Sequence, residues 1–322
     1  MPRRFVNQLA ENESVDEVFL VSEKQLRTNR NGNLYLAVRL SDKSGSLSGM
    51  MWNATDRIAD SFQNGDYVRI TGTTQLYNGM MQMIVTRVDP VDAEKVIDAD
   101  FVTLSATDVG KLASELAAML RAIKNYHLRN LAEACLMDET FMGKFTSAPA
   151  GIKNHHAYRG GLLEHVLSLM KVSAVVAPLY AGLDPDLLLM GAFLHDIGKT
   201  EELVYERDLS YSDEGQLIGH IVMAVGMLEA KIRETEKLAS EPFPVELALR
   251  LKHMIVSHHG EYEYGSPKLP MTLEAIALHF LDNLDSKIYT VKQLITDDAN
   301  TASTWTPYQP AMGRKFYKGE EA

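Results

Sequence analysis

The sequence predicts a multidomain protein in which a small all-β barrel is followed by an all-α domain. Three observations lead to this fold class. Between residues 15 and 90, short stretches of alternating apolar and polar residues are separated by turn residues, which is typical of strands. Beyond residue 100 the apolar residues recur with helical spacing. The charge also changes, since residues 1–90 carry ten Lys and Arg against ten Asp and Glu, whereas the remainder carries 22 against 33.

The barrel is predicted from five short strands. In NGNLYLAVRL the leucines and the valine share one face, and Tyr35 and Arg39 lie on the other. SDKSGSLSGMMW supplies a turn and another strand, and two more strands follow in NGDYVRITGTTQLYNGMMQMIVTRVDPV, joined at Asn78 and Gly79, a strong hairpin signal. With a short helical piece in ATDRIADSF, this pattern indicates a barrel of the OB type. An SH3-like barrel is the alternative.

The all-α domain is predicted from a series of apolar helices. In DPDLLLMGAFLHDIG, Asp184 is the expected N-cap, Pro185 occupies the first helical position, and Gly198 lies just past the helix end. The other helices are expected in GLLEHVLSLMKVSAVVAPLY, GQLIGHIVMAVGMLEAKIRE, PVELALRLKHMIVSHHG and MTLEAIALHFLDNLDSKIYTVKQL. The expected domains are a barrel at residues 1–95, connecting helices at 96–150, the helical domain at 151–300 and a poorly structured C-terminal extension at 301–322.

The composition narrows the class of protein. A net charge of −11 argues against holding nucleic acid by overall positive potential, so an acidic domain that works on a polyanion would need bound cations. The single cysteine, Cys135, cannot form an internal disulfide, which fits a reducing compartment. No stretch approaches about 20 uninterrupted apolar residues, and the first 17 residues are too polar for a secretory signal. We therefore expect a cytoplasmic protein that does not bind membranes.

Polar residues interrupt five successive apolar helices. The interrupting residues are, in order, His165, the pair His195 and Asp196, His220, the pair His258 and His259, and Asp282. All ten histidines of the chain lie in the helical part. One core histidine would be unremarkable, but burying an unpaired polar group costs a few kcal/mol, so polar residues in five helices indicate one shared site.

These residue types suit a metal centre. Imidazole and carboxylate ligands together favour divalent Mn, Fe, Zn or Mg, and the lack of cysteines argues against a structural zinc site. The carboxylate of Asp196 could bridge two ions while its neighbour His195 binds one of them. Such a pair of ions activates water and stabilises the leaving oxygen in phosphoryl displacement. Lys199 could neutralise a phosphate oxygen, and this gives Asp196 and Lys199 the expected catalytic roles.

The order of these residues resembles the H…HD…D signature of the HD metal-dependent phosphohydrolase superfamily, and HDIGK is among its more specific forms. The resemblance implies a first ion held by His165, His195, Asp196 and Asp282, and a second ion that shares Asp196 and is bound by His220, His258 and His259. HD-GYP phosphodiesterases carry a Gly-Tyr-Pro motif after the paired histidines. HHGEYEYGSPKLP has none, so cyclic di-GMP is a poor candidate substrate.

An OB-type barrel before an HD domain, with HHAYRGGLLEH at the junction, is similar to the YhaM-type 3'-5' exoribonuclease family over nearly the full chain. That resemblance implies removal of nucleotides from the 3' end of single-stranded RNA, with some activity on single-stranded DNA. It also implies a divalent metal, typically manganese, with Mg, Fe, Co and Zn as alternatives.

Candidate substrate contacts lie in both parts of the chain. OB barrels stack bases on exposed aromatic side chains, so Tyr35 and Trp52, with Arg39, are expected to contact a single strand. Alternatively, Trp52 closes one end of the barrel core. In the helical part, Arg159 is expected to contact phosphate and His156 to orient the substrate, although an exposed loop explains His156 equally well.

Two further residues, His279 and Asp285, lie about one turn on either side of Asp282. They face either the same cleft or solvent.

Two other functions compete with exoribonuclease activity. One is hydrolysis of small nucleotides by the HD domain with a regulatory barrel, and the other is nucleic-acid binding by a protein whose HD domain is inactive. The complete set of candidate ligands argues against an inactive domain, and the barrel, which is aromatic and not acidic, favours a polynucleotide substrate. A homo-oligomer is compatible with the sequence.

Overall fold

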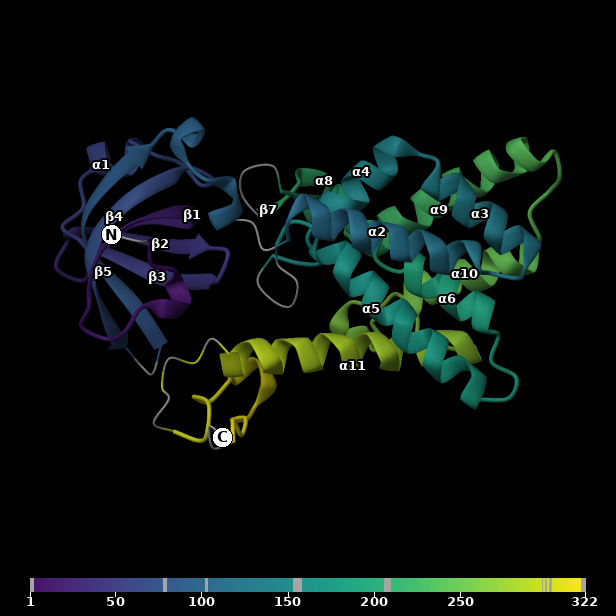
Figure 1. Cartoon of the computed structure of the whole chain (residues 1–322). Coiled ribbons are helices and arrows are strands. Elements are labelled where there is room, and N and C mark those ends of the chain that lie inside the picture. The colour runs from purple at the N-terminus through teal and green to yellow at the C-terminus, as the bar shows by residue number, and fades with distance from the viewer. Residues whose placement is uncertain are drawn as a thin grey trace. The chain divides into compact units, whose positions relative to one another are not determined.

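The computed structural model describes residues 3–77, 80–101, 104–152, 158–205, 210–296, 298, 300 and 303–319. The chain forms two compact units (Figure 1). The first unit comprises Met1–Thr103, Glu206–Asp208 and Val291–Ala322, and the second comprises Leu104–Tyr205 and Leu209–Thr290. The predicted fold class, a five-stranded barrel followed by a helical domain, is confirmed.

The barrel is closed by five strands in the order β1-β2-β3-β5-β4. The strands are β1 (Ser14–Thr28), β2 (Leu34–Asp42), β3 (Gly45–Trp52), β4 (Tyr67–Tyr77) and β5 (Met80–Val91). Neighbouring strands are antiparallel except β3 and β5, which pair in parallel. This strand order, with one parallel pair, is the Greek-key arrangement of an OB barrel. The short helix α1 (Asp56–Asp60) follows β3, and the Thr55 side chain caps it by accepting from the backbone of Ile58.

Strict alternation in β2 places its apolar side chains inside the barrel, as predicted. Leu36, Val38 and Leu40 are buried, whereas Tyr35 and Arg39 are only partly covered. Burial of one face fixes the register of the strand, because a slip of one residue would move every leucine to the outside. Asn78 and Gly79 lie outside the described residues, but the strands that they join pair antiparallel up to Tyr77 and Met80.

The second unit is built from helices. They are α2 (Ala106–Arg121), α3 (Tyr126–Leu136), α4 (Glu139–Ser147), α5 (Gly161–Val176), α6 (Pro185–Leu194), α7 (Lys199–Glu202), α8 (Asp213–Ile218), α9 (His220–Ala239), α10 (Val245–Ser257) and α11 (Leu273–Thr296), the last of which continues into the first unit. A two-stranded ribbon, β6 (Leu203–Val204) and β7 (Ser210–Tyr211), follows α7. Asp184 caps α6 through the backbone of Asp186 and Leu187, as predicted.

The core of this unit centres on α5 and α6. Every residue of α6 from Met190 to Leu194 is buried, and α5 buries nine of its residues. Among the described residues, Gly161–Leu179 is long and apolar enough to cross a membrane by composition, and half of it is buried inside the protein. Such burial is what a core helix requires, and it forces any polar side chain of α5 or α6 to find a partner inside the unit.

The structure confirms one sequence expectation about a glycine and corrects another that involves a glycine. Gly198 lies past the end of α6, as expected. Its φ of −61° shows that it is not a left-handed cap, and its lack of a side chain permits a close backbone approach by His220. The predicted single helix containing His220 is broken at Gly219, whose φ of 80° starts a new helix, so His220 is the first residue of α9. A glycine takes this conformation at no steric cost.

The C-terminal segment is more ordered than the sequence suggests. Residues 303–319 fold back on themselves, with antiparallel bridges between Trp305 and Tyr317 and between Gln309 and Arg314. The Lys318 ammonium lies 2.7 Å from the Asp298 carboxylate, and both side chains are largely buried.

Candidate metal centre

The polar residues that interrupt the apolar helices converge on one site. His165 comes from α5, His195 and Asp196 from the end of α6, and Asp282 from α11. The ligand atoms of His165, His195 and Asp282 lie within 4.8 Å of one another, and so do those of His220, His258 and His259. We call these sets the first and the second ligand group. The structure thus brings together all seven residues that the sequence suggested as metal ligands.

Asp196 lies between the two groups and presents one oxygen to each. Its Oδ2 is 3.3 Å from His195 Nε2 and 3.9 Å from His165 Nε2. Its Oδ1 is 3.4 Å from His220 Nε2 and 3.6 Å from His258 Nε2. A carboxylate in this position can bridge two cations.

The residues fit a metal on their own chemistry. Oδ1 of Asp196 and Nε2 of His220 are buried and have no hydrogen-bond partner among the described residues. Leaving two such atoms unpaired costs about 1–3 kcal/mol each, and a bound cation would satisfy both. The donor set of imidazoles and carboxylates without a thiolate matches borderline and hard divalent metals.

Charges in the site are strongly coupled. Burial alone would raise the pKa of the Asp196 carboxyl, but Lys199 and His195 outweigh it and hold that pKa well below its usual range. The Lys199 ammonium lies 2.6 Å from Asp196 Oδ2. Burial opposes the charged form of His165, yet hydrogen bonds to Asp282 and Asp285 raise the pKa of His165 to about 9. In the absence of metal, His165 therefore carries a proton, and its imidazolium and the Lys199 ammonium are the counter-charges of the ionised Asp282 and Asp196 carboxylates.

The second group is electrically different. Burial lowers the pKa of His258, and burial together with the neighbouring His258 lowers the pKa of His259 to about 4. These imidazoles are neutral at pH 7 and are ready to bind a cation without losing a proton.

Two glycines let the ligand-bearing elements approach closely. A Cβ at Gly198 would lie 2.0 Å from the carbonyl oxygen of His220. A Cβ at Gly260, which has a φ of 79°, would lie 2.0 Å from the ring of His279. His279 Nδ1 lies 2.8 Å from the backbone oxygen of His258. His279 therefore supports the second group through the backbone.

Sequence reasoning missed or left open three residues that the structure places beside candidate site residues. Asp285 lies 2.9 Å from His165 Nδ1, and Glu202 lies 3.1 Å from His220 Nδ1. Asp285 was predicted only to face either the cleft or solvent, and Glu202 carried no sequence signal apart from its position just after HDIGK. The third residue, Arg27, lies on the barrel.

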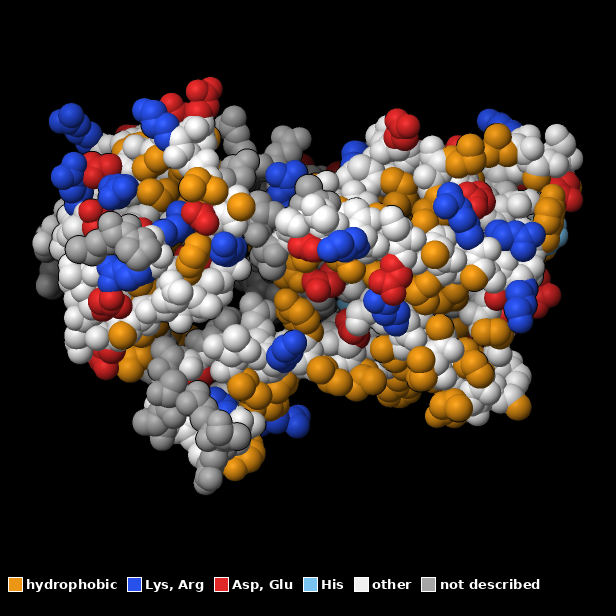
Figure 2. All heavy atoms as spheres, in the orientation of Figure 1, with side chains coloured by type: hydrophobic (Ala, Val, Ile, Leu, Met, Phe, Trp, Pro, Cys, Tyr) orange, Lys and Arg blue, Asp and Glu red, His pale blue; other side chains and the backbone are white. Residues whose placement is uncertain are grey.

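The barrel carries a row of candidate base contacts across three strands. Arg27, Tyr35 and Trp52 are directly opposite one another on β1, β2 and β3, so their side chains share one face. The Tyr35 and Trp52 rings lie 5.4 Å apart, and Trp52 is 50% exposed, so it does not close the barrel core. Arg39 is partly engaged, since its Nε lies 3.8 Å from Glu23. On the visible face of the barrel, basic and acidic side chains are interspersed rather than gathered into one basic field (Figure 2).

The remaining predicted contacts lie around the start of α5. Arg159 is exposed in the turn that precedes this helix. His156 lies outside the described residues.

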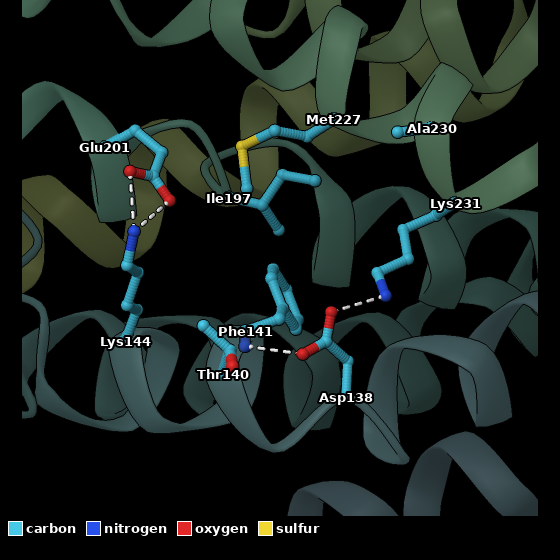
Figure 3. Close-up of a pocket in the computed structure, with 9 residues that line it drawn as sticks. All are labelled: Asp138, Thr140, Phe141, Lys144, Ile197, Glu201, Met227, Ala230 and Lys231. Atoms are coloured by element: carbon cyan, nitrogen blue, oxygen red, sulfur yellow. Dashed lines mark hydrogen bonds and ion pairs between the residues drawn. The ribbon is translucent and has the colours of Figure 1, made fainter. Parts of the chain in front are cut away.

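A separate pocket of about 180 Å³ includes Ile197, the neighbour of Asp196, among its lining residues (Figure 3). The four charged side chains that line it form two ion pairs, Lys144 with Glu201 and Lys231 with Asp138.

Comparisons with known proteins agree with this architecture. Residues 162–287 match the HD domain, and residues 20–91 match an OB-fold nucleic acid binding domain. The chain is 33% identical over 277 residues to the 3'-5' exoribonuclease YhaM of Bacillus velezensis, covering 86% of each chain. It is 32% identical to YhaM of Bacillus subtilis and 33% identical to YhaM of Bacillus licheniformis over the same shares. By this similarity over most of its length, and by its barrel and HD centre, the chain belongs to the YhaM family of 3'-5' exoribonucleases.

Proposed function

We propose that this chain is a metal-dependent 3'-5' exoribonuclease that shortens single-stranded RNA to nucleoside 5'-monophosphates. The observation that carries the proposal is Asp196, a buried carboxylate with one oxygen toward each of two ligand groups. A structural carboxylate in a helical core would be paired on both oxygens, and Asp196 Oδ1 has no hydrogen-bond partner in the described part of the chain. Membership of an exoribonuclease family supports the choice of RNA as substrate.

The two ligand groups would hold two divalent ions that share Asp196. The first group would hold one ion through His165, His195 and Asp282, and the second group would hold the other through its three histidines. Bound there, the ions would supply a nucleophilic water at neutral pH and charge stabilisation for the leaving oxygen. We propose manganese as the working metal, because a mixed imidazole and carboxylate set with no thiolate suits it.

Lys199 supplies positive charge beside the ligand groups. Its side chain is largely buried and its ammonium is held by Asp196 Oδ2. The burial of Asp196 and Lys199 strengthens every electrostatic interaction at this point, because little water is present to screen it. We propose that Lys199 neutralises a non-bridging oxygen of the scissile phosphate.

The barrel provides the grip on the strand. Arg27, Tyr35 and Trp52 combine a cation and two adjacent rings on an exposed face, which suits stacking of successive bases with a contact to the backbone. The balanced charge of the barrel means that stacking, rather than net positive potential, supplies most of the affinity. A small-nucleotide hydrolase would have no use for such a row. Single-stranded DNA is a second substrate that this surface would accept.

The test is degradation of a single-stranded RNA labelled at its 5' end, in the presence of Mn²⁺. The proposal predicts a descending ladder of labelled fragments and release of nucleoside 5'-monophosphates. Asp196→Ala should abolish the ladder, because it removes the shared carboxylate from both ligand groups, while binding of the RNA persists. Immediate release of a labelled mononucleotide would instead indicate attack from the 5' end. A ladder of normal rate from the Asp196→Ala protein would contradict the metal centre.

A further inference from the structure

Each of the five histidines in the two ligand groups has an oxygen partner at the ring nitrogen that faces away from the centre. In each ring, Nδ1 lies within hydrogen-bond distance of an oxygen, and Nε2 is left toward the centre. For His195, His258 and His259 that oxygen is a backbone carbonyl, of Ala192, Ile255 and Tyr264 respectively, at 2.7–2.9 Å. For His165 and His220 it is a side-chain carboxylate. Each ligand group therefore contains one histidine that is held by a carboxylate.

Asp285 holds His165 in the first group. Its Oδ2 lies 2.9 Å from His165 Nδ1, and its Oδ1 accepts a hydrogen bond from the Ser168 hydroxyl at 2.5 Å. Ser168 is on the same helix as His165, whereas Asp285 is on α11 three residues after Asp282. The contact therefore joins α5 and α11, which supply His165 and Asp282 to the first group.

Glu202 holds His220 in the second group. One oxygen, Oε1, accepts from the His220 backbone N–H at 3.0 Å and lies 3.1 Å from Nδ1 of the same residue. That backbone N–H is the unsatisfied donor at the start of α9, so Glu202 acts as a cap as well as a ring partner. Glu202 is 7% exposed, and its own backbone oxygen accepts from Ser212.

We propose that Asp285 and Glu202 are positioning residues, one for each ion, and that each sets the affinity of its own ion independently of the other. The inference rests on the proposed metal centre and adds the two carboxylates that tune it. A carboxylate behind a histidine fixes the tautomer with the proton on Nδ1, turns Nε2 toward the ion and makes the imidazole a better donor. A backbone carbonyl also fixes the tautomer and the orientation of the ring, but it carries no full charge.

The structure predicts separable effects. The groups share Asp196 but not their carboxylate supports, because Asp285 contacts His165 and Glu202 contacts His220. Replacing such a partner weakens metal binding by about 10- to 100-fold. Asp285→Asn should therefore weaken one ion, Glu202→Gln the other, and the double variant both. A general loss of packing would instead weaken both ions in each single variant.

The experiment is titration of the full chain with Mn²⁺ in the absence of RNA. Binding is measured by calorimetry and by the electron paramagnetic resonance signal of free Mn²⁺. The ions are assigned in a His258→Ala background, in which the second group has lost a ligand. There, Asp285→Asn should weaken the remaining tight ion, and Glu202→Gln should leave it unchanged. Glu201→Gln is the matched control, since Glu201 is half exposed, pairs with Lys144 and contacts no histidine. Thermal melts of the metal-free variants report any loss of fold. Glu202→Ala, which has no side-chain acceptor for His220, should bind the ion of the second group more weakly than Glu202→Gln does.

The possible results separate two failures. Two tight ions in the unchanged chain, each weakened by one carboxylate replacement, support the inference. Two tight ions whose affinities do not respond to either replacement, or that weaken together, overturn the inference and leave the metal centre intact. Fewer than two ions in the unchanged chain contradict the two-ion centre itself and with it the inference.

Discussion

The close approach at Gly198 leads to a test of how tightly the metal centre is built. A Cβ at this position would lie 2.0 Å from the His220 carbonyl oxygen, 2.8 Å from its carbon and 2.9 Å from the backbone nitrogen of Ala224. All three are backbone atoms, so no side chain can turn aside. Because Gly198 has an ordinary helical φ of −61°, Gly198→Ala introduces a steric conflict without backbone strain.

The size of the effect follows from these distances. An ordinary contact distance is about 3.4 Å, so the start of α9 must move away from Gly198 by about 1.4 Å, and His220 moves with it. Overpacking of this kind lowers the free energy of unfolding by about 1–3 kcal/mol. A displacement of about 1 Å at a catalytic group can reduce the rate by about 100-fold. We therefore expect Gly198→Ala to bind the second ion weakly and to degrade RNA about 100 times more slowly.

The control is Gly226, a glycine within α9 itself. Gly226 is exposed, and a Cβ there meets nothing within 4 Å. Gly226→Ala should keep full activity and raise stability by about 0.5–1 kcal/mol, because alanine favours a helix. Urea unfolding, Mn²⁺ titration and RNA degradation are measured on both variants. Normal Mn²⁺ affinity and activity in Gly198→Ala would refute the close packing, and equal damage in Gly226→Ala would refute its specificity.

Three other predictions concern substrate binding, pH and charge. Tyr35→Ala or Trp52→Ala should weaken binding of single-stranded RNA about tenfold or more, since each stacked base contributes about 1–3 kcal/mol. Fluorescence anisotropy measures the RNA affinity, and the Mn²⁺ affinity should not change. Unchanged RNA affinity would show that the strand binds elsewhere. The pKa of His165 is raised to about 9 without metal, so below pH 9 the first ion must displace a proton to bind. The affinity of the first group for Mn²⁺ should therefore rise as the pH increases from 6.5 to 8.5, by about tenfold per pH unit for one proton. Calorimetry in buffers of different ionisation enthalpy should detect the released proton, and a pH-independent affinity would count against this protonation state. Lys199→Ala should lower kcat while both ions remain bound, and loss of an ion in this variant would show that Lys199 acts by holding Asp196 in place.

Much of the metal centre could be predicted from the sequence because its ligands are chemically conspicuous. A histidine or aspartate in an otherwise apolar helix, such as His165, needs a buried partner, and the repetition of this pattern in five helices indicates a common site. The barrel was equally accessible, because the alternation in β2 directly reports which face is buried.

The residues that position the ligands could not be predicted from the sequence in the same way. Asp285 and His165 are 120 residues apart, and only the packing of α11 against α5 brings them into contact. Helical periodicity continues on both sides of Gly219, so the sequence gives no sign of the break that lets Glu202 cap α9. Arg27 was hidden for a different reason. The register of β1 shifts between Ser22 and Gln25, and such an irregularity changes which residues share a face.

Gly198 shows why a local rule can mislead. A glycine shortly after a helix is most often a left-handed cap. The structure instead uses Gly198 because a neighbouring backbone passes where a side chain would be. Local sequence reports backbone preference, but it does not report which other segment lies against a residue.

Removal of nucleotides from a free 3' end by a two-ion centre is tested most directly with two forms of one single-stranded RNA sequence, one linear and one circular. Both are incubated with the protein and Mn²⁺ and followed by gel electrophoresis over the same time course. The linear RNA should shorten progressively from its 3' end while the circle stays intact. Cleavage of the circle at a rate comparable to that of the linear RNA would show an endonuclease and rule out a requirement for a free 3' end.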